Sequence, residues 1–387
     1  MLGSKKYIRL FIFLKEFVMN HLTKKVSLLI MSGILGSGFA FSIPLISYAS
    51  ADAIGILGTV VGGALVYREL DDYMNRINNT EEGRQEYFNE LKQKEGVSEN
   101  YARKARLDAM MSRLTEGVAF SDPSIYEKPY LYFLNPKPEF NAACGLGHVL
   151  TINEGIFDLS GSEDEIAVVL AHEMGHGQKD HVVKGTKKKI KTIIGASVAS
   201  GALGGTALSN IAMTALVGQI NNVQITKKQE WEADNLAFDY CYQSGYNPGA
   251  GAALWQRVLE KKGEFRNSLL GEIFSPGDHP THEERRDNYE KRLKKLSGGH
   301  VSVKKNTDTV QVNKKDFITP APANGMSSAE RKYFVMGNLA AGYHQGKNNK
   351  KAYALNGTVM LGDQNILTPV REDPSAEELA DLLNKIK

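Results

Sequence analysis

The chain of 387 residues has little cysteine and little net charge. Its two cysteines, Cys144 and Cys241, exclude a disulfide-dense scaffold and leave room for one bridge. The formal net charge is +3, and no basic stretch is interleaved with aromatic residues as in nucleic-acid-binding proteins. We therefore expect no nucleic-acid partner. Hydrophobic residues at 42% and charged residues at 24% are typical of a globular protein.

The N-terminus has the pattern of a targeting segment. Lys24 and Lys25 precede an apolar run over residues 26–46, which is followed by Ala-Ser-Ala at 49–51. We predict a signal peptide over residues 1–51 that is cleaved after its last alanine, with Met19 as an alternative start. An uncleaved signal anchor is the competing interpretation. A cleaved signal implies an extracytoplasmic protein, periplasmic or associated with the envelope.

Composition divides the remaining chain into four parts. Residues 52–80 begin with a Gly-rich apolar stretch, and residues 81–296 alternate helical patterns with short apolar runs. Residues 297–317 are polar and begin with Ser-Gly-Gly, which predicts a linker. Residues 318–387 carry two capping boxes and two hairpin turn signals, which predict a small α+β unit. No repeat of fixed period is found, and the fold class predicted is α+β, mainly helical.

Residues 162–183 show a clear helical pattern. Ser162 and Glu165 form an S-x-x-E capping box at its start. Ile166, Val169 and Leu170 follow at helical spacing and predict a side that faces the protein core. The helix therefore has a buried face at the point where its polar motif begins.

The motif on this helix is HEMGHG, at residues 172–177. His172 and His176 are four residues apart, so they project from one face and can both reach a Zn²⁺ ion at ~2.0–2.1 Å. Glu173 lies about 100° around the helix, where a carboxylate can act as general base on an attacking water. A catalytic zinc has three protein ligands and one open position, so a third ligand must come from elsewhere.

The segment QEWEADNLAFDY offers candidates for that ligand. Glu230 and Asp234 are again four residues apart on one predicted helical face, whereas Glu232 points away from them. Glu230 is the candidate ligand, and Asp234 could hydrogen-bond a ligating histidine. A solvated acidic face explains the same spacing equally well.

The combination of HEMGH with E-x-x-A-D resembles the gluzincin peptidases of family M48, which include the CAAX prenyl endopeptidase, HtpX and the BepA/LoiP-like secreted branch. The resemblance extends over about residues 80–296 and is closest to the secreted branch. It implies a zinc metallopeptidase domain over residues 81–296 with a zincin-like fold, whose small sheet has an edge strand beside the zinc helix. It also implies one Zn²⁺ per chain, with Glu230 as third ligand and Asp234 behind it.

The same resemblance implies a substrate-binding strand and two further site residues. In such enzymes an edge strand pairs with the substrate backbone, and residues 147–153 are the candidate here. His279 and Arg285 would lie near the metal and contact the reaction intermediate or control access. The residues expected to bind substrate are Asn141, Gly147, His148, Val149, Leu150 and Thr151.

Three functions are compatible with these residues. The first is a zinc-dependent endopeptidase that hydrolyses envelope or misfolded polypeptides. The second is an envelope chaperone or assembly factor with a plugged, largely inactive site, in which His279 would be a fourth ligand. The third, a binding protein with a structural zinc, agrees less well, because structural sites favour cysteine ligands.

Two features leave alternatives open. Residues 192–226 contain no charged residue, and they could form a membrane span, a hairpin on a membrane surface or a flap over the site. We favour a peripheral helix or flap, and we expect residues 192–226 to contact a membrane surface. Cys144 and Cys241 could form a disulfide near the site or remain free thiols.

Overall fold

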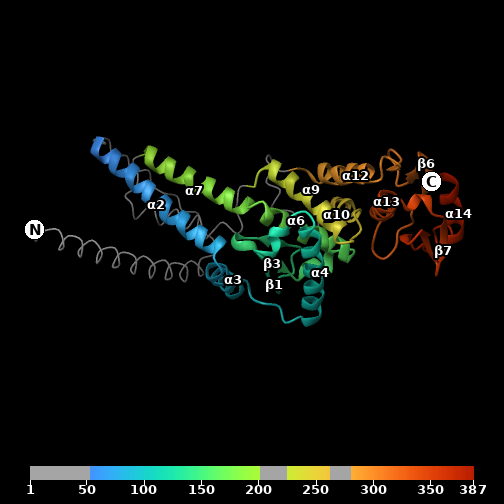
Figure 1. The fold of residues 1–387 in the computed structure, drawn as a ribbon, viewed down its shortest axis with the longest axis horizontal. Coiled ribbons are helices and arrows are strands. Elements are labelled where there is room, and N and C mark those ends of the chain that lie inside the picture. Colours follow the sequence, from blue (N-terminus) through green and yellow to red (C-terminus); the bar gives the residue numbers. More distant parts are fainter. Residues whose placement is uncertain (1–52, 201–224, 262–279) are drawn as a thin grey trace, which may run out of the picture. The chain divides into compact units, whose positions relative to one another are not determined.

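The structure, a computed structural model, describes residues 53–200, 225–261 and 280–387 (Figure 1). These residues belong to two compact units. Residues 53–67 and 192–200 lie in the first, where they form the beginning of helix α2 (Ala53–Asn79) and the end of helix α7 (His181–Ser200). No helix within the described ranges combines the length and the apolar character needed to cross a membrane. Most of residues 192–226 lie outside those ranges.

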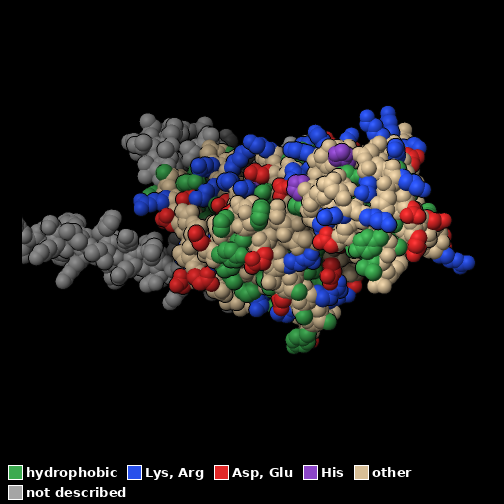
Figure 2. Space-filling model, turned by 45° about the vertical axis from the view of Figure 1, so that its right-hand side comes forward, with side chains coloured by type: hydrophobic (Ala, Val, Ile, Leu, Met, Phe, Trp, Pro, Cys, Tyr) green, Lys and Arg blue, Asp and Glu red, His purple; other side chains and the backbone are tan. Residues whose placement is uncertain are grey.

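The second unit contains the other described residues, including the histidine motif. Besides the rest of α2 and α7, its helices before residue 297 are α3 (Glu81–Glu95), α4 (Tyr101–Ala119), α5 (Gly155–Leu159), α6 (Glu163–Gln178), α9 (Lys227–Gln243), α10 (Ala250–Glu260) and α12 (His282–Leu296). Two short 3-10 turns, Pro123–Tyr126 and Leu146–His148, lie between them. On the face shown in Figure 2, Lys and Arg side chains are interspersed with Asp and Glu, in keeping with the small net charge.

The first sheet has the order β1-β3-β2, with β1 at Leu131–Asn135, β2 at Ala142–Cys144 and β3 at Val149–Asn153. β3 pairs with β1 in parallel and with β2 in antiparallel orientation. The prediction that residues 147–153 form an edge strand is therefore wrong, because β3 is the central strand. Its nearly continuous apolar sequence fits a strand covered on both faces. The edge strand beside α6 is β2, whose three residues are too few to show a period.

Helix α6 is shorter than the sequence predicts. Ser162 accepts a hydrogen bond from the Glu165 backbone, as expected for the cap. The helix ends at Gln178, before the predicted end at residue 183, because Asp180 adopts a left-handed φ of 51°. α7 then begins at His181.

The segment predicted as a linker contains a three-stranded antiparallel sheet. Its strands are β4 (Val301–Val303), β5 (Val310–Val312) and β6 (Lys315–Ile318). A second antiparallel sheet is formed by β7 (Ala352–Leu355), β8 (Thr358–Leu361) and β9 (Gln364–Leu367). The Asn356-Gly357 turn signal is confirmed, since both residues have positive φ between β7 and β8.

The two sheets share a register shift and a threonine–threonine hydrogen bond, a likeness that the sequence does not show as a repeat of fixed period. Residues 309–320 and 358–369 are offset by 49 positions and share only four of twelve residues, namely Thr, Val, Thr and Pro at 309, 310, 319 and 320. Each copy has a register shift after its first valine and a hydroxyl–hydroxyl hydrogen bond between its two threonines, of 2.7 Å in the first and 2.8 Å in the second. Each sheet is followed by a capped helix, α13 (Ser328–His344) or α14 (Ala376–Ile386).

Helix α13 joins this C-terminal region to the rest of the unit. It packs against α10 and α12, and one continuous hydrophobic core runs through both regions. A buried ion triad lies at the junction. Arg257 of α10 is 3.3 Å from a carboxylate oxygen of Glu165 on α6, and 2.9 Å from one of Glu330 on α13. The C-terminal residues are therefore part of the same packed body as helix α6.

Gly337 makes the close approach of α13 possible, and Gly342 on the same helix allows a matched test. A Cβ atom at Gly337 would lie 2.0 Å from Oδ1 of Asn247 and 2.4 Å from the Gly249 nitrogen, so we expect Gly337→Ala to destabilise the protein by about 1–3 kcal/mol. A Cβ at Gly342, on the same helix, would meet Leu361 at an ordinary 3.5 Å. Gly342→Ala is expected to be neutral or to stabilise by up to about 1 kcal/mol. Chemical denaturation measures both values, and equal stability of the two variants would contradict the close contact.

Candidate active site

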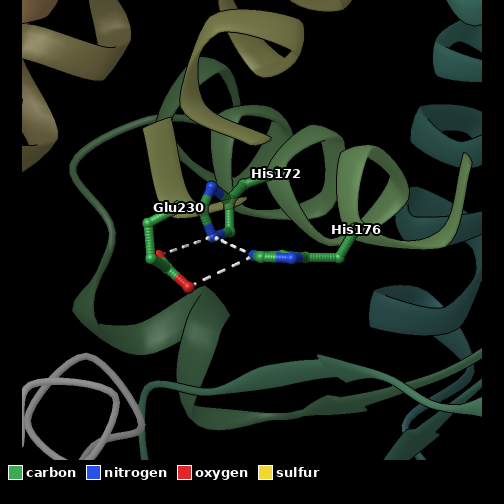
Figure 3. Close-up of side chains that lie close together, drawn as sticks. All are labelled: His172, His176 and Glu230. Atoms are coloured by element: carbon green, nitrogen blue, oxygen red, sulfur yellow. Dashed lines mark hydrogen bonds and ion pairs between the residues drawn. The ribbon is translucent and has the colours of Figure 1, made fainter. Parts of the chain in front are cut away.

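The site is formed where α6 and α9 pack together. Gly175 of α6 faces Ala233 of α9, and a Cβ at Gly175 would be only 3.2 Å from the Ala233 backbone. This close approach brings Glu230, one turn earlier on α9, next to the two histidines of α6. Figure 3 shows the three side chains converging from the two helices. All three are buried.

The donor atoms of these residues have the spacing of a zinc site. The Nε2 atoms of His172 and His176 are 3.0 Å apart, and each is 3.5 Å from a carboxylate oxygen of Glu230. Two ligands at ~2.0–2.1 Å from a tetrahedral zinc ion lie about 3.3 Å apart. Two imidazole nitrogens and one carboxylate oxygen also match the donors that zinc prefers. The residues therefore fit one Zn²⁺ ion without rearrangement of the fold.

A buried arginine and aspartate support this donor set. The Nδ1 atom of His172 is 3.0 Å from Oδ1 of Asp234, so the ring faces Asp234 with one nitrogen and the donor cluster with the other. Arg285 of α12 donates through Nε to Asp234 at 2.7 Å, contacts the same carboxylate through Nη2, and lies over the Trp255 ring at 3.9 Å. This bidentate pairing makes Arg285 a positioning group for Asp234.

The charges of the cluster follow from these contacts. Burial alone would raise the pKa of the Glu230 carboxyl, but the two histidines and Arg285 outweigh burial and hold that pKa well below its usual range. Arg285 and His172 likewise hold the pKa of Asp234 below its usual value despite complete burial. Both carboxylates are therefore ionised near neutral pH, as a metal ligand and its supporting acceptor must be.

Glu173 is held by the backbone of the edge strand. Its Oε2 atom accepts a hydrogen bond of 2.9 Å from the Cys144 amide in β2. His172 and Glu173 line one pocket together with Asn141 and Ala142 from the edge-strand segment and Trp255 from α10. The Glu173 carboxylate is thus held beside the pocket that His172 also lines.

Comparison with known proteins agrees with this geometry. The sequence of residues 101–293 matches the family described as Peptidase family M48. The chain contains a peptidase family M48 domain. The M48 domain therefore spans α4 to α12 and includes every residue of the cluster described above.

Curated relatives of the M48 domain carry protease names. Metalloprotease LoiP of Escherichia coli is 30% identical over 173 residues, which are 44% of this chain and 65% of LoiP. The beta-barrel assembly-enhancing protease of the same organism is 26% identical over 142 residues, 34% of this chain and 29% of that protein. Mitochondrial metalloendopeptidase OMA1 of Arabidopsis thaliana is 27% identical over 153 residues, 38% and 28% of the two chains. The chain thus spans less than two thirds of each of these relatives.

The remaining residues predicted for the site are spread over several parts of the chain. His279 lies outside the described residues, so its predicted part at the metal, as a contact or as a plug, stays a prediction. Asn141 precedes β2 and lines the pocket. The predicted substrate-binding residues Gly147, His148, Val149, Leu150 and Thr151 belong to the turn before β3 and to β3 itself, the central strand. Cys144 and Cys241 are free, buried thiols in the structure.

Sequence reasoning missed two polar residues behind the cluster. His181 is buried, with its Nδ1 atom 2.9 Å from Nδ1 of His176. Its Nε2 atom is 3.3 Å from Glu232, which was set aside because it points away from Glu230. His181 is five residues after His176, a spacing that leaves the shared face of a continuous helix. The helix break at Asp180 returns it to His176, and nothing in the helical period signals that break.

Proposed function

We propose that this protein is a zinc-dependent endopeptidase with one zinc ion per chain, held by His172, His176 and Glu230. The observation that supports the proposal is the set of three donor distances of 3.0–3.5 Å, which suit a single tetrahedral ion. Zinc bound there would polarise the scissile carbonyl and make an attacking water more acidic. With three protein ligands, one coordination position remains for substrate or solvent.

The chain's own residues supply the proton transfers and the alignment. The Glu173 carboxylate takes a proton from the attacking water and delivers it to the leaving amine, so the base returns to its ionised form. The Cys144 amide donates a hydrogen bond to one oxygen of this carboxylate and so limits its rotation. The other carboxylate oxygen is available to accept the proton. Asp234 accepts from Nδ1 of His172 and thereby holds that ring in the orientation a ligand needs.

The substrate backbone is proposed to pair with β2. The Gly145 amide donates to Val149, and the Asn141 carbonyl accepts from Asn153. Residues 141, 143 and 145 therefore use their backbone groups toward β3, and those of Ala142 and Cys144 point to the open edge. The Cys144 amide bond to Glu173 lies on that edge. A polypeptide added beside Ala142 would thus pass directly in front of the general base.

The side chain of Asn141 supports the same substrate position. Its Oδ1 atom is buried and has no hydrogen-bond partner among the described residues, although it lines the pocket with His172 and Glu173. A buried acceptor without a partner costs about 1–3 kcal/mol, so a substrate N–H at this place would relieve that cost. We assign Asn141 to substrate binding on this basis.

The cellular setting follows from the predicted signal peptide. We propose an extracytoplasmic protein whose substrates are envelope or misfolded polypeptides, with residues 192–226 as a candidate for membrane-surface contact. Two of the relatives, a metalloprotease and a beta-barrel assembly-enhancing protease, have names that agree with polypeptide substrates.

Removal of the metal tests the function. The purified chain is expected to hydrolyse casein, to lose that activity after dialysis against a strong chelator, and to regain it with about one equivalent of zinc. Zinc at 100 times its dissociation constant should also raise the free energy of unfolding by about 2.7 kcal/mol. Full hydrolysis by a chain shown by elemental analysis to contain no metal would contradict the proposal.

A further inference from the structure

His181 occupies the first position of α7 and lies directly behind His176. The two rings have their centroids 5.0 Å apart at 71°, and their Nδ1 atoms are 2.9 Å apart. Nε2 of His181 is 3.3 Å from Oε2 of Glu232, on the helix that also carries Glu230. In Figure 3 the second nitrogen of His176 lies on the side of the ring away from Glu230. A line of polar atoms therefore runs from the donor cluster through two imidazoles to a carboxylate.

Only one arrangement of protons satisfies this line when His176 ligates a metal. Nε2 of His176 must present its lone pair to the ion, so the neutral ring carries its proton on Nδ1. That proton can be donated only if Nδ1 of His181 has a free lone pair. His181 must then carry its own proton on Nε2, where Glu232 accepts it. Each tautomer is fixed by the next group in the line.

We propose that His181 and Glu232 form a positioning relay that fixes the tautomer and orientation of the ligand His176 and raises its affinity for zinc. The inference rests on the proposed metal site. It gives His176 the same kind of support that Asp234 gives His172, through a neutral ring instead of a carboxylate. Neither residue of the relay touches the substrate or the reacting atoms.

The burial of His181 and of Glu232 determines how much each contributes to zinc affinity. His181 is 2% exposed, so its acceptor nitrogen meets no competing water. The Glu232 side chain is 45% exposed, and water can replace much of its contribution. The substitution of His181 should therefore weaken zinc binding more than the substitution of Glu232.

Zinc affinity tests the relay independently of catalysis. His181→Leu removes the acceptor at similar volume and is expected to raise the zinc dissociation constant about 10–100-fold. His181→Asn places an amide oxygen near the position of Nδ1 and should restore most of the affinity. Competition with a chromophoric chelator measures each constant, and the absorption spectrum of the cobalt-substituted chain reports whether His176 keeps its geometry. His300→Asn, at an exposed histidine far along the sequence, is the matched control.

The outcomes separate the relay from the proposed function. If the unaltered chain binds no zinc, the proposed function fails and the relay with it. If the unaltered chain binds zinc and a folded His181→Leu chain binds it equally well, the relay alone is overturned. If His181→Leu fails to fold, Glu232→Ala tests the relay, because Glu232 is half exposed and its loss should leave the fold intact. A loss of zinc affinity of about 2–10-fold supports the relay, and no loss overturns it.

Discussion

Glu173→Gln is expected to lower kcat/KM for peptide hydrolysis by about 10²–10⁴-fold while zinc remains bound. Glutamine has nearly the same shape and can still accept the Cys144 amide hydrogen bond through its side-chain oxygen. It cannot take a proton from water at neutral pH, so the general-base step is lost and the fold is kept. The metal ligands are not altered by this change.

The measurement combines initial rates on a fluorogenic peptide with zinc content and thermal melting of the same preparation. Glu163→Gln is the matched control on the same helix, because Glu163 is half exposed and pairs with Arg106 away from the site. It should retain full activity. A Glu173→Gln chain that turns over at the rate of the unaltered protein would remove Glu173 from the mechanism.

Glu230→Gln is expected to raise the zinc dissociation constant by more than 100-fold, because the loss of a mere supporting residue costs about 10–100-fold. An amide oxygen carries no charge and is a poor zinc ligand, so two imidazoles would remain for an ion that needs a third donor. Glu230 also lies 3.7 Å from Arg285, so the substitution removes one of the carboxylates near that buried cation, while Asp234 stays paired with it. Peptide hydrolysis should fall together with zinc content.

The control for this variant is Asp239→Asn, on the same helix α9. Asp239 is 55% exposed, and its pairing with Arg292 lies at the surface. Isothermal titration of zinc into the metal-free chains gives both constants. Unchanged zinc affinity in the Glu230→Gln chain would show that the third ligand lies elsewhere and would refute the donor set proposed above.

The sequence predicted the local part of the site because a helix repeats every 3.6 residues. Ser162 marks the start of α6, and the four-residue spacing places His172 and His176 on one face. Glu230 was found because the same spacing recurs on α9 and because the E-x-x-A-D pattern resembles a known family. Each of these inferences depends on residues within a single helix.

The features that the sequence did not predict depend on how helices and strands pack against one another. The role of His181 depends on one left-handed residue, Asp180, which ends α6 and turns the chain. The order of the first sheet depends on where β2 inserts, and a strand of three residues has no readable period. The C-terminal repeat is preserved mainly as equivalent buried positions, such as Val312 and Leu361, because only four of its twelve aligned residues are identical.

The ion triad of Glu165, Arg257 and Glu330 has a consequence for the boundaries of the M48 domain. The match to the family ends at residue 293, yet Glu330 shares its buried arginine with the third residue of helix α6. A chain that ends at residue 293 would keep the Arg257–Glu165 pair but lose the 2.9 Å contact of Arg257 with Glu330 and the helix α13 that carries it. The M48 domain is therefore not a self-contained module: a graft that carries only residues 101–293 would lose one of the buried contacts that surround the start of helix α6.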